Sequence, residues 1–133
     1  MISTKGRYAL RLMIDLATQD PTSYIPLKDI ATRQGISEKY MEIIIKALVK
    51  EKLITGMRGK GGGYKLLKKP SEYLVGEILE SAGEQLSPVA CLLPGADICA
   101  RESVCPTLSM WQQYDKLSHD FFYGISLTEL LNN

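Results

Sequence analysis

Apolar residues recur at three- and four-residue spacing in several stretches of this chain, which is the pattern of amphipathic helices. The clearest stripe consists of Tyr8, Ala9, Leu12, Met13, Leu16 and Ala17. We expect helices over residues 4–18, 27–34, 38–51, 74–81 and 106–123, and a short last helix opened by a capping box of Ser126 and Glu129.

Helix-end signals divide the second and third of these helices. Pro26 suits the start of a helix, and Gly35 suits a left-handed cap at its end. Ser37 is then placed as an N-cap, with Glu38 in the first turn. Two helices joined in this way predict a helix-turn-helix whose second member is a recognition helix. The alternative is a plain helical hairpin without a role in DNA binding.

A glycine-rich segment follows the two helices. Residues 53–57 and 64–67 have the composition of short strands, and Arg58-Gly59-Lys60-Gly61-Gly62-Gly63 joins them. Glycines and two cations at the tip would let the backbone approach phosphates closely. No helix and no Gly-Lys-Ser/Thr ending follow, so the segment is not a nucleotide-binding P-loop. The fold class predicted is mainly α with a small β-hairpin wing: a winged helix-turn-helix over residues 1–70.

The remaining residues, 71–133, are expected to form a second unit with a cysteine loop at about 83–105 and dimerisation helices. The long helix over 106–123 would span about 27 Å, which is long for so small a chain to bury alone. Its aromatic stripe suits a homodimer interface, although packing against the chain's own first helix is an alternative. The interface residues expected are Met110, Trp111, Tyr114, Leu117 and Phe121.

Composition places the chain among ordinary globular proteins and excludes a collagenous, disordered or disulfide-dense chain. It has 133 residues, of which 45% are hydrophobic and 23% charged. No apolar run reaches the roughly 18 residues of a membrane helix, and no signal peptide opens the sequence. We therefore expect a cytoplasmic protein without a membrane partner.

The net charge of +1 hides a strong segregation. Residues 1–70 carry 14 of the 16 Lys and Arg but 6 of the 15 Asp and Glu, so the first half is basic and the second acidic. This polarity favours a polyanion-binding front half. A chance excess of cations on a solvated face is the alternative.

All three cysteines, Cys91, Cys99 and Cys105, lie in one short region. An odd number without a secretory signal argues against a disulfide framework. Thiolates are soft ligands that suit iron–sulfur clusters, zinc or cuprous ions. The usual CxxC spacing of structural zinc is missing. The spacing leaves a metal site and three unrelated free thiols both open.

The sequence offers little material for catalysis. A nucleophilic cysteine needs a nearby base and an orienting group, and the only histidine is His119, on a distant part of the predicted long helix. No recognisable pair of carboxylates or nucleotide fingerprint is present. We therefore expect no enzyme, the alternative being a thiol enzyme or metal-handling protein whose basic half is incidental.

Three segments together carry a family resemblance: Ser3 to Ala9, Ile36 to Glu42, and Arg58 to Tyr64. They resemble the Rrf-type bacterial regulators, and the cysteine trio narrows this to IscR- and NsrR-like members. The resemblance implies a homodimeric transcription factor that binds an operator in double-stranded DNA. It implies that Cys91, Cys99 and Cys105 hold an iron–sulfur cluster that controls DNA affinity, with cluster-assembly genes as targets. The alternative within this fold is a repressor that senses nitric oxide or thiol redox state.

The resemblance also implies DNA contacts. Arg58 would enter a minor groove, where it senses groove width and potential, and the helix from Glu38 would lie in the major groove. Lys39 and Lys46 suit phosphates, and Glu42 can accept from a cytosine amino group. Ile43 replaces a glutamine common in the family, and can only contact a thymine methyl or turn inward. The full expected set is Lys5, Ser37, Lys39, Tyr40, Glu42, Lys46, Arg58, Gly59, Lys60 and Gly61.

A 2Fe–2S cluster needs a ligand beyond three cysteines. IscR-like members supply a histidine three residues after the third cysteine, where this chain has Leu108. His119 would lie about 21 Å further along a helix. The matching region for an NsrR-like first-helix carboxylate reads Arg7-Tyr8-Ala9. The fourth ligand is therefore unknown, with Asp97, Glu102, Thr107, a partner-chain group or an exogenous molecule open.

Overall fold

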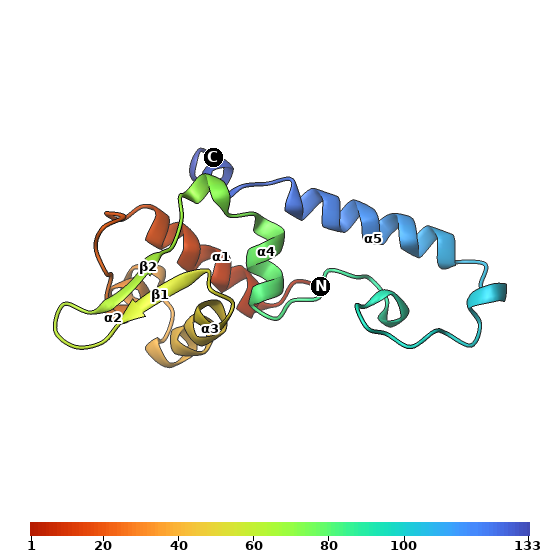
Figure 1. Ribbon diagram of the computed structural model, residues 1–133, viewed down its shortest axis with the longest axis horizontal. Coiled ribbons are helices and arrows are strands. Elements are labelled where there is room, and N and C mark those ends of the chain that lie inside the picture. The colour runs from red at the N-terminus through yellow and green to blue at the C-terminus, as the bar shows by residue number, and fades with distance from the viewer.

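The computed structural model describes residues 1–133 as a helical body with a β-hairpin and a long projecting arm (Figure 1). The predicted helices and the hairpin are confirmed, and none of the helices has the length and hydropathy of a membrane span. The main elements are α1 (Thr4–Ala17), α2 (Leu27–Gln34), α3 (Glu38–Lys50), β1 (Ile54–Met57), β2 (Gly63–Leu66), α4 (Val75–Ser81), α5 (Leu108–Tyr123) and α6 (Leu127–Leu131). Short 3₁₀ helices are η1 (Pro70–Glu72), η2 (Ala90–Leu92) and η3 (Glu102–Val104).

The predicted helix boundaries hold within one or two residues. Gly35 adopts a left-handed φ of 65° after α2, and the Ser37 side chain accepts a hydrogen bond from the Tyr40 amide at 3.1 Å as the N-cap of α3. The Ser126–Glu129 capping box is present at α6. The long helix differs slightly, because α5 begins at Leu108, two residues after Pro106.

One apolar core holds the body together. The inward stripes of α1, α2 and α3 meet in it, and α4 and α6 add Ile78 and Leu127 from the second half of the chain. Tyr73, fully buried, lies in the same core and joins the wing to α4. The buried residues of α3 are Met41, Ile44, Ile45 and Leu48, as the periodicity predicts.

The wing is an antiparallel pair in which Ile54 faces Leu66 and Met57 faces Gly63. Ile25, in the connection between α1 and α2, adds a bridge on the other side of β2 through two hydrogen bonds of 2.8 Å with Tyr64. At the tip, Gly59 and Gly61 have positive φ values, which a side chain would strain. This geometry leaves the tip exposed beyond the body.

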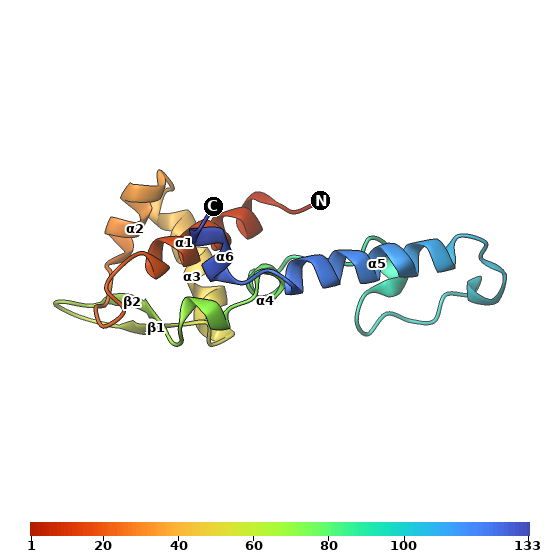
Figure 2. The same ribbon diagram turned by 90° about the horizontal axis from the view of Figure 1, so that it is seen from above.

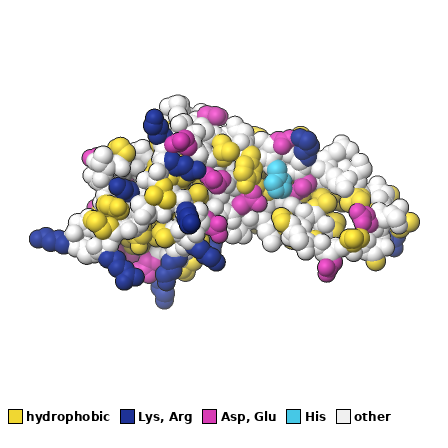
Figure 3. Space-filling model, viewed as in Figure 1, with side chains coloured by type: hydrophobic (Ala, Val, Ile, Leu, Met, Phe, Trp, Pro, Cys, Tyr) yellow, Lys and Arg dark blue, Asp and Glu magenta, His cyan; other side chains and the backbone are white.

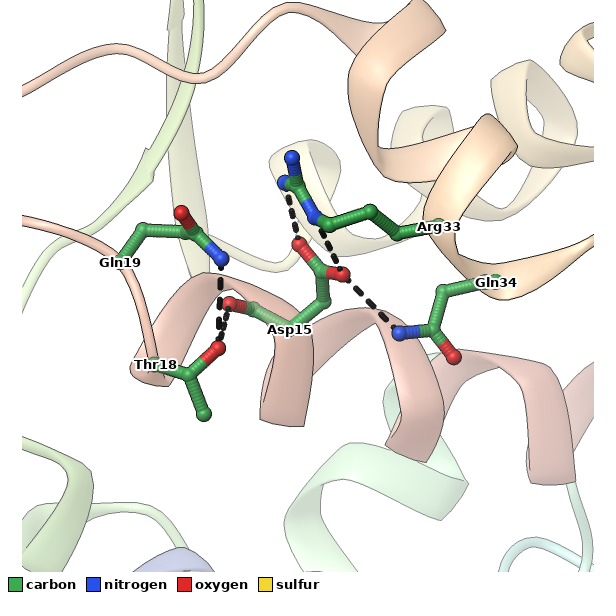
Figure 4. Close-up of polar contacts among 5 residues, drawn as sticks. All are labelled: Asp15, Thr18, Gln19, Arg33 and Gln34. Carbon is green, nitrogen blue, oxygen red and sulfur yellow. Dashed lines mark hydrogen bonds and ion pairs between the residues drawn. The ribbon is translucent and has the colours of Figure 1, made fainter.

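A buried carboxylate fixes α1 against α2 (Figure 4). Asp15 is 4% exposed and accepts hydrogen bonds from Arg33 at 2.7 and 3.0 Å and from Gln34 at 2.9 Å. The hydrogen bond to Asp15 is the main cause that raises the pKa of Arg33. Since a buried charge is tolerated only when paired, this bidentate contact is the polar partner that Asp15 needs, and it ties α1 to α2.

The helix α5 projects from the body as an arm (Figures 1 and 2). It packs against α4, and none of its residues is buried. Where the two helices meet, burial and then the hydrogen bond to Glu80 raise the pKa of Tyr123 to about 12, so its hydroxyl stays protonated and donates. The cysteine segment leaves the body and runs outward alongside α5, which then leads back toward the body (Figures 1 and 2).

Glu84, where the cysteine segment leaves the body, is bound to the start of α1. Its carboxylate accepts hydrogen bonds from the amides of Ser3 at 3.1 Å and Gly6 at 3.0 Å, and from the Ser3 hydroxyl. A Cβ on Gly6 would meet the Glu84 side chain at 2.5 Å, so a larger residue there would displace this carboxylate. Burial alone would raise the pKa of Glu84, but these hydrogen bonds outweigh it and lower the pKa below 4.5.

We therefore expect the variant Glu84→Gln to be less stable than wild type at neutral pH. A carboxylate whose pKa is lowered in the folded state stabilises the fold at pH values above its pKa in the unfolded chain. That contribution is lost as the pH falls through the pKa of the folded state. The difference in melting temperature between wild type and Glu84→Gln should thus be largest at pH 7 and become smaller below pH 4.5. Thermal unfolding at stepped pH measures this. Glu51→Gln, on an exposed residue, serves as the control, and a gap independent of pH would contradict the assignment.

Candidate nucleic-acid interface and cysteine cavity

The outward face of α3 carries most of the residues expected to contact DNA. Lys39, Glu42, Ile43 and Lys46 are exposed, opposite the buried stripe. Ile43 is 49% exposed and therefore points outward, which removes the expectation that it could turn into the core. Of the two roles expected for this residue, the contact with a thymine methyl stays a prediction.

Tyr40, also on the expected list, is only partly exposed. Its ring makes an edge-to-face contact with Tyr8 of α1, with centroids 5.6 Å apart. The Arg11 guanidinium lies 5.1 Å from the centroid of the Tyr8 ring on the same helix. Tyr40 therefore connects the first turn of α3 to α1 through an aromatic contact, in addition to any contact it makes with a ligand.

The wing tip offers free cations. Arg58, Gly59, Lys60 and Gly61 are all exposed, and neither cation forms an ion pair within the chain. Lys5, half-buried, lies at the start of α1. Basic side chains gather on the side of the body that carries α3 and the wing, whereas few lie on the arm (Figure 3). The charge segregation of the sequence is thus a segregation in space.

Cys91, Cys99 and Cys105 line one cavity of about 160 Å³ on the arm. All three are free thiols, and two of them are exposed. Leu108 and Gln112 of α5 form one wall, and Leu92, Ala96, Asp97, Ile98 and Glu102 complete the lining. No three of the Cys, His, Asp and Glu side chains of the chain converge as a ready metal site. The segment brings the three thiols to one cavity without converging them on a common point.

The donor set of the cavity suits a soft metal group. Hydrogen bonds from the Thr107 hydroxyl, 3.5 Å from the Cys105 sulfur, and from the Thr107 amide lower the pKa of the Cys105 thiol. This favours the thiolate, the form that ligates metals. Leu108, three residues after Cys105, lines the wall and has no atom that can bind a metal. His119 is outside the cavity, with Nδ1 at 2.8 Å from the Asp115 carbonyl oxygen.

The stripe expected to form an interface is exposed on the arm. Met110, Tyr114, Leu117 and Phe121 are between 52% and 69% exposed. Trp111 is half-buried and lines a hollow with Leu86, Pro88 and Phe122. Sequence reasoning missed the residues that join the arm to the body, namely Glu84 and Tyr123. Their partners lie 78 and 43 positions away in the chain, so no local pattern reveals them.

Comparisons with known proteins agree with this geometry. Residues 2–133 match the Rrf2 family, described as iron-dependent transcriptional regulators. The HTH-type transcriptional regulator IscR of Klebsiella pneumoniae strain 342 is 37% identical over 132 residues, which cover 99% of this chain and 80% of that protein.

Comparison with solved structures leads to the same family. IscR of T. potens superposes with a TM-score of 0.74 at 32% identity, covering 99% of this chain and 86% of that one. CymR, the global cysteine regulator of B. subtilis, superposes with a TM-score of 0.77 at 29% identity, covering 99% and 96%. A winged helix with free cations on α3 and the wing, matched nearly end to end by these proteins, makes this chain a transcriptional regulator of the Rrf2 family and not an enzyme.

Proposed function

We propose that this chain is a cytoplasmic, homodimeric, DNA-binding regulator whose operator affinity is set by a 2Fe–2S cluster on Cys91, Cys99 and Cys105, and that it controls cluster-assembly genes. The observation that carries the proposal is the single cavity lined by all three thiols, at a distance from a winged helix whose cations are free. The relatives named IscR and the iron-dependent family description support the same reading.

In this proposal α3 enters the major groove and the wing approaches the backbone. Lys39, Lys46 and Lys60 bind phosphates, and so position the protein without reading bases. Arg58 enters a minor groove, where a narrow groove attracts it most strongly. The glycines on either side of Lys60 have no side chain to hold the backbone away from the phosphates. Lys5, Ser37 and Tyr40 support the contact from the helix ends.

Glu42 and Ile43 are adjacent exposed residues of α3 that suit base contacts. Glu42 accepts from a cytosine amino group and is repelled by phosphate, and Ile43 contacts a thymine methyl. Glu42 is in no ion pair of the chain, and about half of the Ile43 surface is exposed to a ligand. Sequence readout is thereby concentrated on two adjacent side chains of the recognition helix.

The cysteine segment connects the proposed cofactor to the DNA-binding body. Cys91, Cys99 and Cys105 would hold the cluster, which would crosslink their thiolates and so order the segment between Glu84 and α5. Glu84 at one end binds the start of α1 close to Lys5, and the Ser118 hydroxyl of α5 donates to the Leu86 carbonyl at 3.3 Å. Ordering of this segment changes the DNA-binding body only if cluster binding favours one arrangement of the body over another.

Operator binding with and without cluster tests the proposal. Protein purified anaerobically should be coloured and hold about two irons per chain. Its affinity for a duplex selected from a random-sequence pool should fall steeply with added salt. That affinity should differ between the wild type with cluster and the cluster-free variant Cys99→Ala. Arg58→Ala should weaken binding most at sites with a narrow minor groove. Equal affinities with and without cluster, at fixed salt, would exclude the switch.

A second function, thiol-redox or nitric-oxide sensing by the same fold, is favoured by one observation. Hydrogen bonds from Thr107 lower the pKa of the Cys105 thiol, and a lowered pKa raises the thiolate fraction available for oxidation. Anaerobic protein that is colourless, but whose Cys105 reacts faster with an alkylating reagent than Cys91, would support this second function over the first.

A further inference from the structure

The short helix η3 places an acidic side chain between two of the cysteines. Glu102 opens η3, three residues after Cys99 and three before Cys105. The Glu102 amide donates to the Cys99 carbonyl at 3.0 Å, so the turn begins at Cys99. A 3₁₀ helix has about three residues per turn, and side chains three apart eclipse one another. Cys99 and Cys105 lie just outside η3, and the three-residue spacing favours a common side for them and Glu102.

That side of the turn faces the cavity. Cys99, Glu102 and Cys105 all line it, whereas Arg101, Ser103 and Val104 between them do not. Cys91 lines the same cavity from η2. A carboxylate thus lines the same cavity as the three thiols, from the short helix between two of them.

The other donors in the region are less suited. Thr107 is a neutral hydroxyl that already contacts the Cys105 sulfur. Gln112 presents a neutral amide from α5, and Leu108 has no donor. Asp97 lines the cavity as well, but it lies two residues before Cys99 and outside the turn. Asp97 is therefore the matched comparison for Glu102: a second carboxylate on the same cavity with a different placement.

We propose that Glu102 is the fourth protein ligand, binding iron through a carboxylate oxygen beside Cys91, Cys99 and Cys105. The assignment rests on the proposed cluster function and supplies the ligand that the missing histidine leaves open. An oxygen donor is harder than a thiolate or imidazole and suits soft iron–sulfur chemistry less well. One such ligand in an exposed segment makes the site open to exchange.

Hyperfine spectroscopy tests the ligand directly. Wild-type chain is made by cell-free synthesis with ¹³C-labelled glutamate, reconstituted with iron and sulfide under anaerobic conditions, and reduced. Electron–nuclear double resonance should detect ¹³C coupled to the cluster spin. The coupling should vanish in Glu102→Gln and persist in Asp97→Asn, and no other labelled glutamate lines the cavity.

Cluster retention gives a second readout. Loss of the ligand in Glu102→Gln should accelerate cluster transfer to an iron chelator by about tenfold or more, in line with the effect of removing supporting groups at metal sites. Glu102→Cys should restore slow transfer, with an altered visible spectrum from an added thiolate. Asp97→Asn should behave as wild type in both measurements.

The outcomes distinguish failure of the Glu102 assignment from failure of the proposed cluster function. A wild type that holds a cluster but shows no ¹³C coupling, or a Glu102→Gln variant that keeps wild-type retention, overturns the assignment of Glu102 alone. A variant Asp97→Asn that sheds its cluster while Glu102→Gln does not overturns it in favour of Asp97. A wild type that takes up no cluster overturns this assignment together with the proposed function.

Discussion

Replacing Leu117 and Phe121 together by glutamate is expected to leave the chain monomeric and to lower its operator affinity by about 100-fold or more, since linking two half-sites raises avidity by that order. The two side chains are 69% and 62% exposed, and the contact given for them within the subunit is the edge-to-face packing of Phe121 on Phe122, so the substitutions disturb the subunit's own core little. The introduced glutamates would instead lose water at the centre of an apolar interface without gaining an ion-pair partner, which opposes association of the subunits.

The spacing of the stripe supports this expectation. Met110, Tyr114, Leu117 and Phe121 follow one another at intervals of four, three and four residues, the seam spacing of paired helices. The arm that carries them has no buried residue of its own. A second copy of the same arm is the simplest partner for such a surface, because a two-fold interface uses the same patch twice.

Sedimentation equilibrium and DNA binding measure the two effects. Leu67→Glu is the control for oligomeric state, because Leu67 is 53% exposed but lies beside the wing, outside the stripe. Its variant should remain dimeric. A double variant at Leu117 and Phe121 that still sediments as a dimer would show that subunits associate through another surface.

Tyr73→Phe is expected to lower the free energy of unfolding by about 3 kcal/mol, since each buried polar group left unpaired costs about 1–3 kcal/mol. The Tyr73 side chain is completely buried. Its hydroxyl donates to the Leu53 carbonyl at 2.6 Å and accepts from the amides of Leu67 and Lys68 at 2.9 and 3.3 Å. Burial raises the pKa of Tyr73, so the hydroxyl stays protonated and able to donate.

Removal of this hydroxyl leaves three backbone groups without their hydrogen-bond partner, at the point where the wing joins the body. Urea unfolding measures the loss, and wing mobility should rise with it, because Leu53 precedes β1 and Leu67 follows β2. Tyr24→Phe is the control, since the structure gives the Tyr24 hydroxyl no hydrogen bond and its ring contacts Lys65 instead. A Tyr73→Phe variant within 1 kcal/mol of wild type, a difference in the range of ordinary surface substitutions, would contradict this role.

Much of the recognition half could be predicted from local pattern. The α3 stripe of Met41, Ile44 and Leu48 follows from 3.6-residue periodicity alone. The caps at Gly35 and Ser37 depend on side chains and backbone within a few residues. The exposed glycine hairpin is equally local. Such features are determined by neighbours in the chain, and the structure changes their ends by one or two residues only.

The second half of the chain could be predicted less well. The pattern of residues 74–81 and of the last helix predicts helices but not where they pack, and Ile78 and Leu127 in fact complete the core around α1. The charge of Asp15 gives no sign that it is buried, because its partners Arg33 and Gln34 lie on another helix. These positions depend on contacts between segments far apart in the sequence.

The sequence by itself therefore determined the helices, the hairpin, the basic front half and the presence of three clustered thiols, because short-range periodicity, caps and composition specify them. Only the tertiary structure decided that α5 is an exposed arm, that Glu84 fastens the cysteine segment to α1, and that Glu102 faces the same cavity as the thiols. The reason is physical: burial and side-chain convergence depend on which surfaces meet in space, and spacing along the chain constrains that meeting only within a turn or two.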